Sequence, residues 1–385
     1  MDFKLNDEQK LLVQTVRDFI TKELLPLEDE IEETGQLDPS KAKAIYQKSK
    51  SLGFYAMNIP EEFGGGGLSA IDTCLVEEQF GRVKDILIRR AFGNVYEVLL
   101  KCNEAQRERW LLPAVKGERT CSIAITEPGA GSDDTAIKTR AVKDGDGWRL
   151  TGSKHFISDG EFSDFFVVSA LTDTKSISLF LIDKPSPGFR LGRNQPMMGL
   201  AGTSHSELFF DDIKLGSENL LGGEGEGRRL VLETLGRVRL TQVGARAIGK
   251  ATRLLEMMVS YANERQQFGQ KIGEFQLIQE MIADSVVEVN AARLMLLRAA
   301  WDLDQGRDAR DWISMVKIQA AETLGRVADR TVQVFGGMGY CEDVSVARMY
   351  RDARIYRIFD GTSEIHRTVV ARRALKLGAP IFDIV

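Results

Sequence analysis

The feature that most constrains this chain is a double change of hydrophobic periodicity along its 385 residues. In 1–119, apolar residues such as Leu12 and Val16 recur at the spacing of amphipathic helices. In 120–228 they alternate at the two-residue spacing of strands, and in 229–385 the helical spacing returns. These changes predict three domains: an N-terminal helical domain, a middle β-sheet domain and a C-terminal helical domain.

Local signals divide these domains into elements. Asn6 followed by Gln9 is typical of a helix start. The glycine run 64–67 indicates a turn, because no Lys-Ser or Lys-Thr pair follows it as in a phosphate-binding loop. Helices are expected from about residue 7 and over 38–52, 69–100 with an interruption at 84–93, 104–113, 229–263, 273–304, 309–336 and 364–376. Strands are expected over 121–126, 148–151, 165–171, 176–182 and 207–210.

Composition argues against several classes of function. The 51 basic and 56 acidic residues leave a net charge of −5, which does not suit nucleic-acid binding. No run approaches the roughly 18 apolar residues of a membrane span. The first residues resemble neither a signal peptide nor a transit peptide, so we expect a cytoplasmic protein of bacterial type. The four cysteines are scattered and there are only three histidines, so no metal site is expected.

A candidate catalytic group lies near the C-terminus. Asp360 follows two apolar residues and precedes Gly361, which places a carboxylate at the end of an apolar strip. A carboxylate in a water-poor site has a raised pKa and can act as a general base. Thr362 or Ser363 can cap the helix that follows. On this stretch alone, the simpler interpretation of Asp360 is a turn or N-cap residue.

Four further stretches combine glycines, hydroxyls and aromatic residues in a way that suits a flat or phosphorylated ligand. In the glycine loop 126–133, Gly129 and Gly131 allow close approach of the backbone, and Ser132 offers a hydroxyl. The second stretch combines the aromatic Phe156 with the hydroxyl of Ser158, and the third combines the cation Arg265 with the aromatic Phe268. The fourth is another glycine loop, with Gln333, Gly336 and Gly337. Each of these signals is weak alone.

Together with Phe359-Asp360-Gly361-Thr362, these motifs make the chain resemble the acyl-CoA dehydrogenase family over essentially its whole length. The spacings from Thr126 to Phe156, from Arg265 to Gln333 and from Gln333 to Asp360 match those of the family without gaps. The resemblance implies the fold of that family, with an N-terminal helical domain, a middle β-barrel or β-sheet domain and a C-terminal four-helix bundle. It also implies FAD bound in the cleft between the domains and a homotetramer made of two dimers. A monomer should bind FAD poorly, because the loop 333–337 is expected to reach the FAD of the neighbouring subunit.

The resemblance also assigns roles to residues. Asp360 would remove the α-proton of an acyl-CoA thioester while hydride leaves the β-carbon for flavin N5, and its backbone N–H would hold the thioester oxygen. The electrons would pass to an electron-transfer flavoprotein. Substrate contacts are expected from Ser132, Arg239 and Gly361. FAD contacts are expected from Ile123, Ile125, Thr126, Gly131, Ser132, Phe156, Ser158, Arg265, Phe268, Gln276, Gln333, Gly336, Gly337, Thr362 and Glu364.

Two positions depart from the family pattern. The usual base is Glu, and Asp360 is shorter by one methylene. A displacement near 1 Å at a reacting centre can cost roughly a hundredfold, so the backbone or the substrate must compensate. The common arginine of the family falls at Leu240, while Arg239 lies one residue earlier. Either the helix entry is shifted by one residue, or the role of the arginine has changed.

The segment 84–100, which normally closes the acyl pocket, carries Arg89 and Arg90. These arginines either lie on a solvated helix face or bind the acyl end of the substrate. A buried arginine would need a carboxylate, from Asp85, from Glu97 or from the ligand. The second interpretation predicts an acyl group that is polar, anionic, or compact and branched, instead of a long alkyl chain.

Three functions fit these observations. The first is FAD-dependent acyl-CoA dehydrogenation. The second keeps the fold and changes the chemistry, to nitroalkane oxidation or to elimination or desulfination of an acyl-CoA. Asp360 and the missing arginine at 240 favour the second, whereas the intact loop 127–133 argues against it. The third, a non-catalytic flavoprotein that acts as a scaffold, is disfavoured by the carboxylate at 360.

Overall fold

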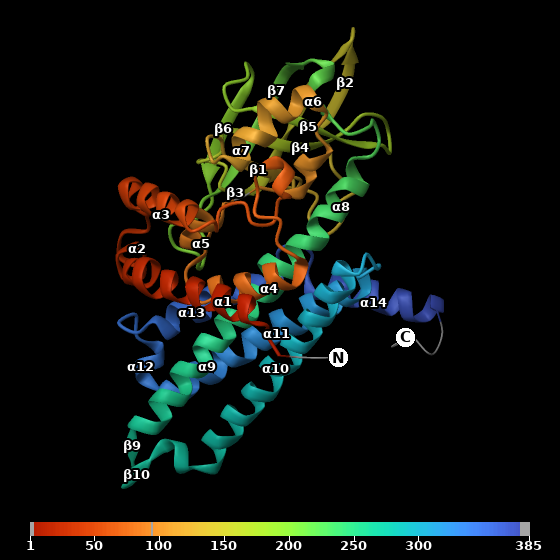
Figure 1. The fold of residues 1–385 in the computed structure, drawn as a ribbon. Coiled ribbons are helices and arrows are strands. Elements are labelled where there is room, and N and C mark those ends of the chain that lie inside the picture. Colours follow the sequence, from red (N-terminus) through yellow and green to blue (C-terminus); the bar gives the residue numbers. More distant parts are fainter. Residues whose placement is uncertain (1–3, 94, 378–385) are drawn as a thin grey trace.

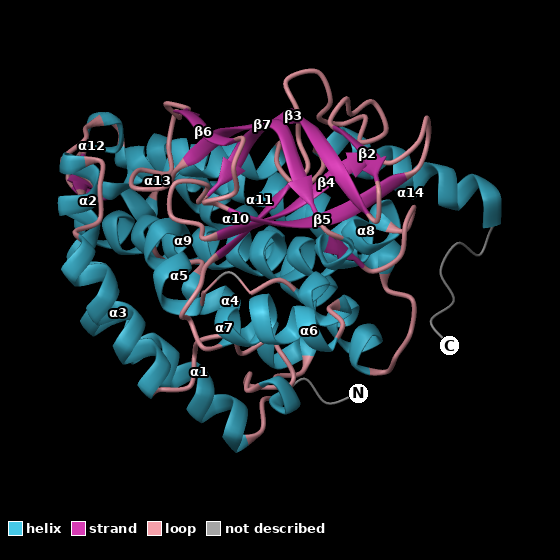
Figure 2. Cartoon of the chain, turned by 90° about the horizontal axis from the view of Figure 1, so that it is seen from above, coloured by secondary structure: helices cyan, strands magenta, loops and turns pink. Residues whose placement is uncertain are grey.

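The computed structural model describes residues 4–93 and 95–377. Helices precede and follow an eight-stranded sheet in the chain, so the predicted order of helices, sheet and helical bundle is confirmed. The sheet lies at one end of the molecule, and the long helices extend away from it (Figure 1). Seen from above, the strands of the sheet lie over helices of both helical regions (Figure 2).

The N-terminal helices begin where the sequence offers caps. The Gln9 backbone N–H donates to Asn6 Oδ1 at 2.8 Å and the Asn6 N–H donates to Gln9 Oε1, which forms the capping box of the first helix. Asp38 caps the third helix, with Pro39 as its first residue. The helices of this region are α1 (Asp7–Phe19), α2 (Glu28–Thr34), α3 (Pro39–Ser51), α4 (Ala70–Phe80), α5 (Asp85–Phe92), α6 (Glu104–Gln106) and α7 (Leu112–Val115).

The expected interruption at 84–93 is wrong, because most of it forms helix α5. This helix is buried on nearly all sides, including Asp85 at its start and Phe92 at its end. A helix without a solvent-facing side has no apolar stripe for the sequence to reveal. The true break between α4 and α5 covers only residues 81–84.

The strands form one sheet whose two halves share a core. The strand order is β6-β7-β3-β2-β4-β5-β8, and β1 pairs with β4 in parallel. Trp148 of β3 lies against Phe180 of β5, with ring centroids 5.5 Å apart. Strands β2 and β6 were not expected, because they are mostly exposed and polar. The strands are β1 (Cys121–Ala124), β2 (Arg140–Asp144), β3 (Gly147–Ser158), β4 (Phe165–Leu171), β5 (Ile177–Asp183), β6 (Phe189–Asn194), β7 (His205–Leu215) and β8 (Leu220–Leu221).

Strand β4 shows how the sheet joins the helices. Phe166 faces the core inside the sheet, whereas its neighbour Phe165 packs in a second cluster with Trp110 of the N-terminal region and Leu230 of the C-terminal region. Because successive side chains of a strand point to opposite faces, both faces of β4 are covered. This explains why β4 is apolar along its whole length and not in alternation.

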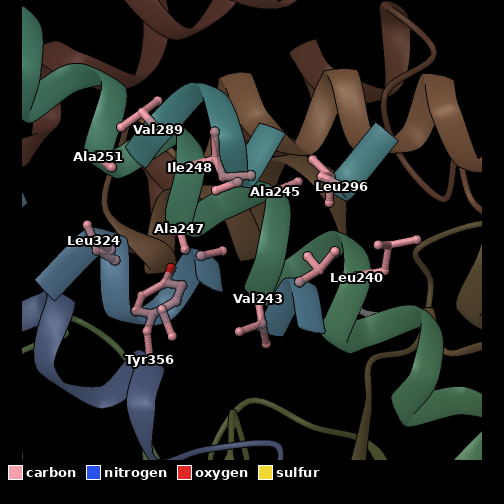
Figure 3. Close-up of a cluster of buried hydrophobic side chains, with 14 of the residues drawn as sticks. Leu240, Val243, Ala245, Ala247, Ile248, Ala251, Val289, Leu296, Leu324 and Tyr356 are labelled. Atoms are coloured by element: carbon pink, nitrogen blue, oxygen red, sulfur yellow. The ribbon is translucent and has the colours of Figure 1, made fainter. Parts of the chain in front are cut away.

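The C-terminal region is a bundle of long helices. Its core includes Leu240, Val243, Ile248 and Tyr356 (Figure 3). Of the helices in the described residues, none is both long and apolar enough to cross a membrane. The elements are α8 (Gly227–Val238), α9 (Arg246–Glu264), the hairpin of β9 (Gln266–Gln267) and β10 (Gln270–Lys271), α10 (Gln276–Asp304), α11 (Arg310–Phe335), α12 (Gly337–Tyr340), α13 (Ser345–Arg354) and α14 (Ser363–Leu377).

Candidate active site

Asp360 lies in the turn between α13 and α14, in a conformation unusual for a residue other than glycine. Its φ is 53° and that of Gly361 is 92°, so two successive residues adopt positive φ. Thr362 Oγ1 accepts the Ile365 N–H at 3.1 Å and caps α14, so the cap is Thr362 and not Asp360. Burial raises the pKa of Asp360. The positive charges of Arg239 and Lys317 act in the opposite direction, but the pKa remains above its ordinary value. The residue thus has the perturbed carboxyl group that a general base requires.

Arg239 reaches Asp360 from the helical bundle. Its Nε donates a hydrogen bond to the carbonyl oxygen of Asp360 at 2.7 Å. Between α8 and α9 the chain forms a π-helical segment, Arg239–Ala245, in which each turn holds one more residue than an α-helical turn. Leu240, the position where the resemblance predicts an arginine, is buried in the bundle core. Arg239 and not Leu240 therefore contacts Asp360.

The glycine loop 126–133 lies between β1 and β2. Glu127 anchors this loop through Lys154, whose Nζ donates to Glu127 Oε1 at 2.8 Å. The adjacent Asp134 pairs with Arg228 of α8, Oδ2 to Nε at 3.1 Å, and its negative charge opposes the lowering of the Arg239 pKa by burial. Gly131 borders open space, because a Cβ added there would meet no atom within 4 Å. The loop is thus anchored at Glu127 and borders open space at Gly131.

Two further predicted residues end strand β3 beside this loop. Phe156 has φ 58°, is 49% exposed and stacks on His155 with centroids 4.0 Å apart. The carbonyl oxygen of Ser158 accepts the Ser122 hydroxyl at 2.6 Å, which ties the end of β3 to β1. The predicted residues Ile123 and Ile125, on and just after β1, pack against the same apolar cluster as Tyr96. The His155 backbone N–H donates to the carbonyl oxygen of Thr126 at 2.8 Å, so the exposed ring of Phe156 lies beside the start of the glycine loop.

Arg89 and Arg90 of α5 form ion pairs with a carboxylate that the sequence did not indicate. Both pair with Asp159, which follows β3: Arg89 Nη1 lies 3.2 Å from Oδ2 and Arg90 Nη2 lies 3.4 Å from Oδ1. Burial would raise the pKa of Asp159, but the two arginines hold it below its ordinary value. Neither Asp85 nor Glu97, the partners suggested by the sequence, forms this pair. The charge of Arg89 is among those that oppose the effect of burial on the pKa of Asp360 and on the pKa of Tyr96.

Comparison with protein families identifies this architecture. Models of the N-terminal, middle and C-terminal domains of acyl-CoA dehydrogenase match residues 6–118, 122–213 and 225–375. The chain belongs to the acyl-CoA dehydrogenase family. Membership makes the protein an oxidoreductase that acts on acyl-CoA, and the predicted family is confirmed.

Relatives and solved structures of this family match along nearly the whole chain. "Caffeyl-CoA reductase-Etf complex subunit CarC" from Acetobacterium woodii is 35% identical and covers 96% of this chain and 99% of the relative. "Acryloyl-CoA reductase (NADH)" from Anaerotignum propionicum is 36% identical and covers 98% and 96%. The structure of butyryl-CoA dehydrogenase from Megasphaera elsdenii has a TM-score of 0.90 at 33% identity, covering 97% and 100%. The FAD complex of PigA has a TM-score of 0.91 at 29% identity, covering 98% and 99%.

The remaining residues predicted from the acyl-CoA dehydrogenase resemblance to bind FAD form a second group. Arg265 and Phe268 lie at the β9–β10 hairpin, at the end of the bundle away from the sheet (Figure 1). Phe268 is 94% exposed, with φ 53°. Tyr261 stacks on Phe335 with centroids 4.2 Å apart, which places the hairpin beside the end of α11. We refer to these residues as the distal group: Arg265, Phe268, Gln276, Gln333, Gly336 and Gly337.

Two residues near Asp360 were not identified from the sequence. Lys317 of α11 is fully buried, and its Nζ has no hydrogen-bond partner among the described residues. Burial lowers the pKa of Lys317 to about 8, while the charge of Asp360 raises it. It occupies an apolar position of its helix between Ile313 and Ala320, a pattern that could have revealed it. His366 of α14 also contacts Asp360, and as a lone histidine it gave no signal.

Proposed function

We propose that the protein oxidises the α,β-bond of an acyl-CoA thioester with Asp360 as the general base. The observation that carries this proposal is the environment of Asp360: burial raises the pKa of its carboxyl group, and its backbone carbonyl accepts a hydrogen bond from Arg239 at 2.7 Å. A base of raised pKa removes protons efficiently near neutral pH. The arrangement supports the family reaction over an N-cap role, because Thr362 already caps α14.

In this proposal Asp360 has two roles, one for its side chain and one for its backbone. Its carboxylate takes the α-proton of the substrate. Its backbone N–H donates to the thioester oxygen, on which negative charge develops as the proton leaves. Among the described residues no acceptor receives this N–H, so it is available to the substrate. Arg239 and Lys317 keep part of the carboxyl population ionised, because their positive charges oppose the effect of burial.

FAD is the cofactor of this reaction and supplies the acceptor for the hydride when it is bound. The residues present fit it. Around the sheet, the open glycine loop and the half-exposed ring of Phe156 offer backbone contacts and an aromatic face. Gly336 and Gly337 of the distal group also border open space, since a Cβ added at either would meet no atom within 4 Å. Arg265 provides a cation for phosphate beside them.

One FAD would contact both groups if they come from different subunits. Arg239, which contacts Asp360, precedes α9, and Arg265 follows the end of α9. The 19 residues of α9 alone rise by about 28 Å, so Arg265 lies far from Asp360. We therefore propose that the distal group completes the site of a neighbouring subunit in a homotetramer. Exposed apolar side chains on α10 support such an interface, among them Val287 and Leu294, which lie seven residues apart and so share one face of the helix.

The proposed substrate class is a compact acyl group. Arg89 and Arg90 are paired with Asp159, so an anionic acyl end is not needed to compensate their charge. The charges of Tyr96, Arg89 and Asp360 act on one another, and we expect the ring of Tyr96 and the guanidinium of Arg89 to restrict an extended alkyl chain. We expect butyryl- or isobutyryl-CoA to be better substrates than octanoyl- or glutaryl-CoA.

The same site also supports the reverse reaction. A carboxyl group with a raised pKa can return a proton to the α-carbon, so Asp360 serves reduction of an unsaturated thioester as well. Two relatives are named as reductases, one of them in a complex with Etf. We propose an electron-transfer flavoprotein as the electron partner in both directions.

The experiment that tests the proposed function is anaerobic reduction of the purified flavoprotein. The flavin absorbance is followed after addition of butyryl-, isobutyryl-, glutaryl- or octanoyl-CoA, or of a nitroalkane. Bleaching by the compact acyl-CoAs alone is the expected result. Bleaching by the nitroalkane only would contradict acyl-CoA oxidation, and fastest bleaching by octanoyl-CoA would contradict the substrate class.

A further inference from the structure

The carbonyl oxygen of Asp360 receives two hydrogen bonds from separate parts of the chain. Arg239 Nε donates at 2.7 Å from the start of the π-helical segment, and His366 Nε2 lies 3.2 Å away on the first turn of α14. A backbone carbonyl has two lone pairs and can accept both bonds. The oxygen is therefore held from the bundle on one side and from α14 on the other.

The protonation state of His366 follows from its surroundings. The ring is buried, and burial together with the charges of Arg239 and Lys317 lowers its pKa to about 4. It is therefore neutral near pH 7 and carries one ring hydrogen. Because the carbonyl of Asp360 can only accept, this hydrogen must be on Nε2. Nδ1 has no hydrogen-bond partner among the described residues.

The backbone at this point needs such support. A positive φ at a residue with a side chain costs free energy and persists only where the surroundings impose it. Gly361 leaves room for the ring, since a Cβ there would lie 2.8 Å from His366 Nε2. Two donors on one carbonyl fix the peptide that follows Asp360. They thereby fix the direction of its short side chain relative to the backbone.

We propose that His366 is a positioning residue that acts with Arg239 to hold Asp360 in the orientation required for proton transfer. This inference rests on the proposed role of Asp360 as the base. An aspartate reaches less far than the glutamate expected at this position, so small rotations of its backbone would displace the carboxylate from the α-carbon. Such displacements reduce rates steeply. The two bonds supply the backbone compensation that the shorter side chain needs.

The test compares two replacements of similar size. His366→Gln keeps an N–H donor, whereas His366→Met removes it. We expect His366→Met to reduce its flavin about ten- to a hundredfold more slowly at saturating acyl-CoA, and His366→Gln to stay within about threefold of the parent. FAD content and acyl-CoA affinity should not change. Thr368→Ala, at an exposed position of the same helix, is the control and should match the parent.

Parental rates in His366→Met would overturn the proposal. A glutamine variant as slow as the methionine variant would also overturn it, because ring shape and not the donor would then matter. If the methionine variant fails to fold, a measurement on the parent protein tests the proposal instead. Nitrogen NMR of its three labelled histidines should show His366 neutral with the hydrogen on Nε2, and a hydrogen on Nδ1 would refute the second bond.

The same series separates this inference from the proposed function. A slow Asp360→Asn variant together with a fast His366→Met variant refutes only the positioning role. An Asp360→Asn variant that reduces its flavin at the parental rate refutes the base itself.

Discussion

At the scale of the residue, an ionised carboxylate at Asp360 is costly to the fold. Its pKa is raised in the folded protein, so above the ordinary aspartate pKa the folded state retains a proton that the unfolded state has lost. The free energy of unfolding therefore falls as the pH rises through that window. Residues of this kind trade stability for function.

Asp360→Asn should therefore stabilise the protein at neutral and alkaline pH. The amide removes the buried charge and keeps the size of the side chain. We expect the midpoint of thermal unfolding to rise relative to the parent at pH 8, and the gain to shrink as the pH falls towards the ordinary aspartate pKa. Scans of both proteins with equal FAD occupancy provide the measurement. A variant that is less stable than the parent at pH 8 would contradict the raised pKa.

At the scale of the element, α4 and α9 cross at close contact. A Cβ at Gly249 would lie 1.9 Å from the carbonyl oxygen of Glu78, so only glycine fits at this crossing. Beside it, Arg246 binds Glu77 through two hydrogen bonds, Nε to Oε2 at 2.6 Å and Nη2 to Oε1 at 3.0 Å. Both side chains are almost completely buried. The pair joins the N-terminal helices to the bundle.

Breaking this pair should destabilise the protein strongly. Glu77→Leu leaves the guanidinium of Arg246 buried without its carboxylate, a change that costs about 3–5 kcal/mol. The double variant Glu77→Leu/Arg246→Met removes both charges and should recover much of that loss. Glu256→Leu, which removes the exposed partner of Arg82, is the control and should cost at most about 1 kcal/mol. Urea unfolding measures all three, and equal midpoints for Glu77→Leu and Glu256→Leu would contradict the account.

The elements differ in how far the sequence reveals them. Helix α1 was predictable because Asn6 and Gln9 form its cap locally. Helix α5 was not, because it is buried by partners distant in the chain, among them Asp159 of the sheet region. Local sequence likewise identified Asp360, because its apolar and glycine neighbours lie beside it in the chain. The contact of His366 with Asp360 depends on the conformation of the turn between them, which the sequence does not reveal. The domain boundaries at 119/120 and 228/229 stay predictions.

At the scale of the whole molecule, the predicted FAD contacts fall into two groups at opposite ends of the bundle (Figure 1). If a site combines groups from two subunits, defects in different groups should complement each other. A chain with Asp360→Asn keeps an intact distal group, and a chain with Phe268→Asp keeps an intact Asp360. Each pair formed by the two different chains then contains one site in which both groups are intact.

Co-expression of these two inactive variants should therefore restore acyl-CoA oxidation to a part of the parental level. Each variant expressed alone should be inactive, the first through loss of the base and the second through loss of FAD. Purification through different tags on the two chains isolates the mixed oligomer. Lys271→Ala, an exposed change on the same hairpin, should leave FAD content unchanged. A mixed oligomer without activity would show that each site lies within a single chain.

The measurement that tests the central claim most directly is the rate of anaerobic flavin reduction in Asp360→Asn. With a compact acyl-CoA at saturation, removal of the base should slow reduction by about 10²- to 10⁴-fold. FAD content and acyl-CoA binding should remain those of the parent, because asparagine has the size of aspartate and lacks only its affinity for the proton. If the variant bleaches its flavin at the parental rate, Asp360 is not the base and the account is wrong.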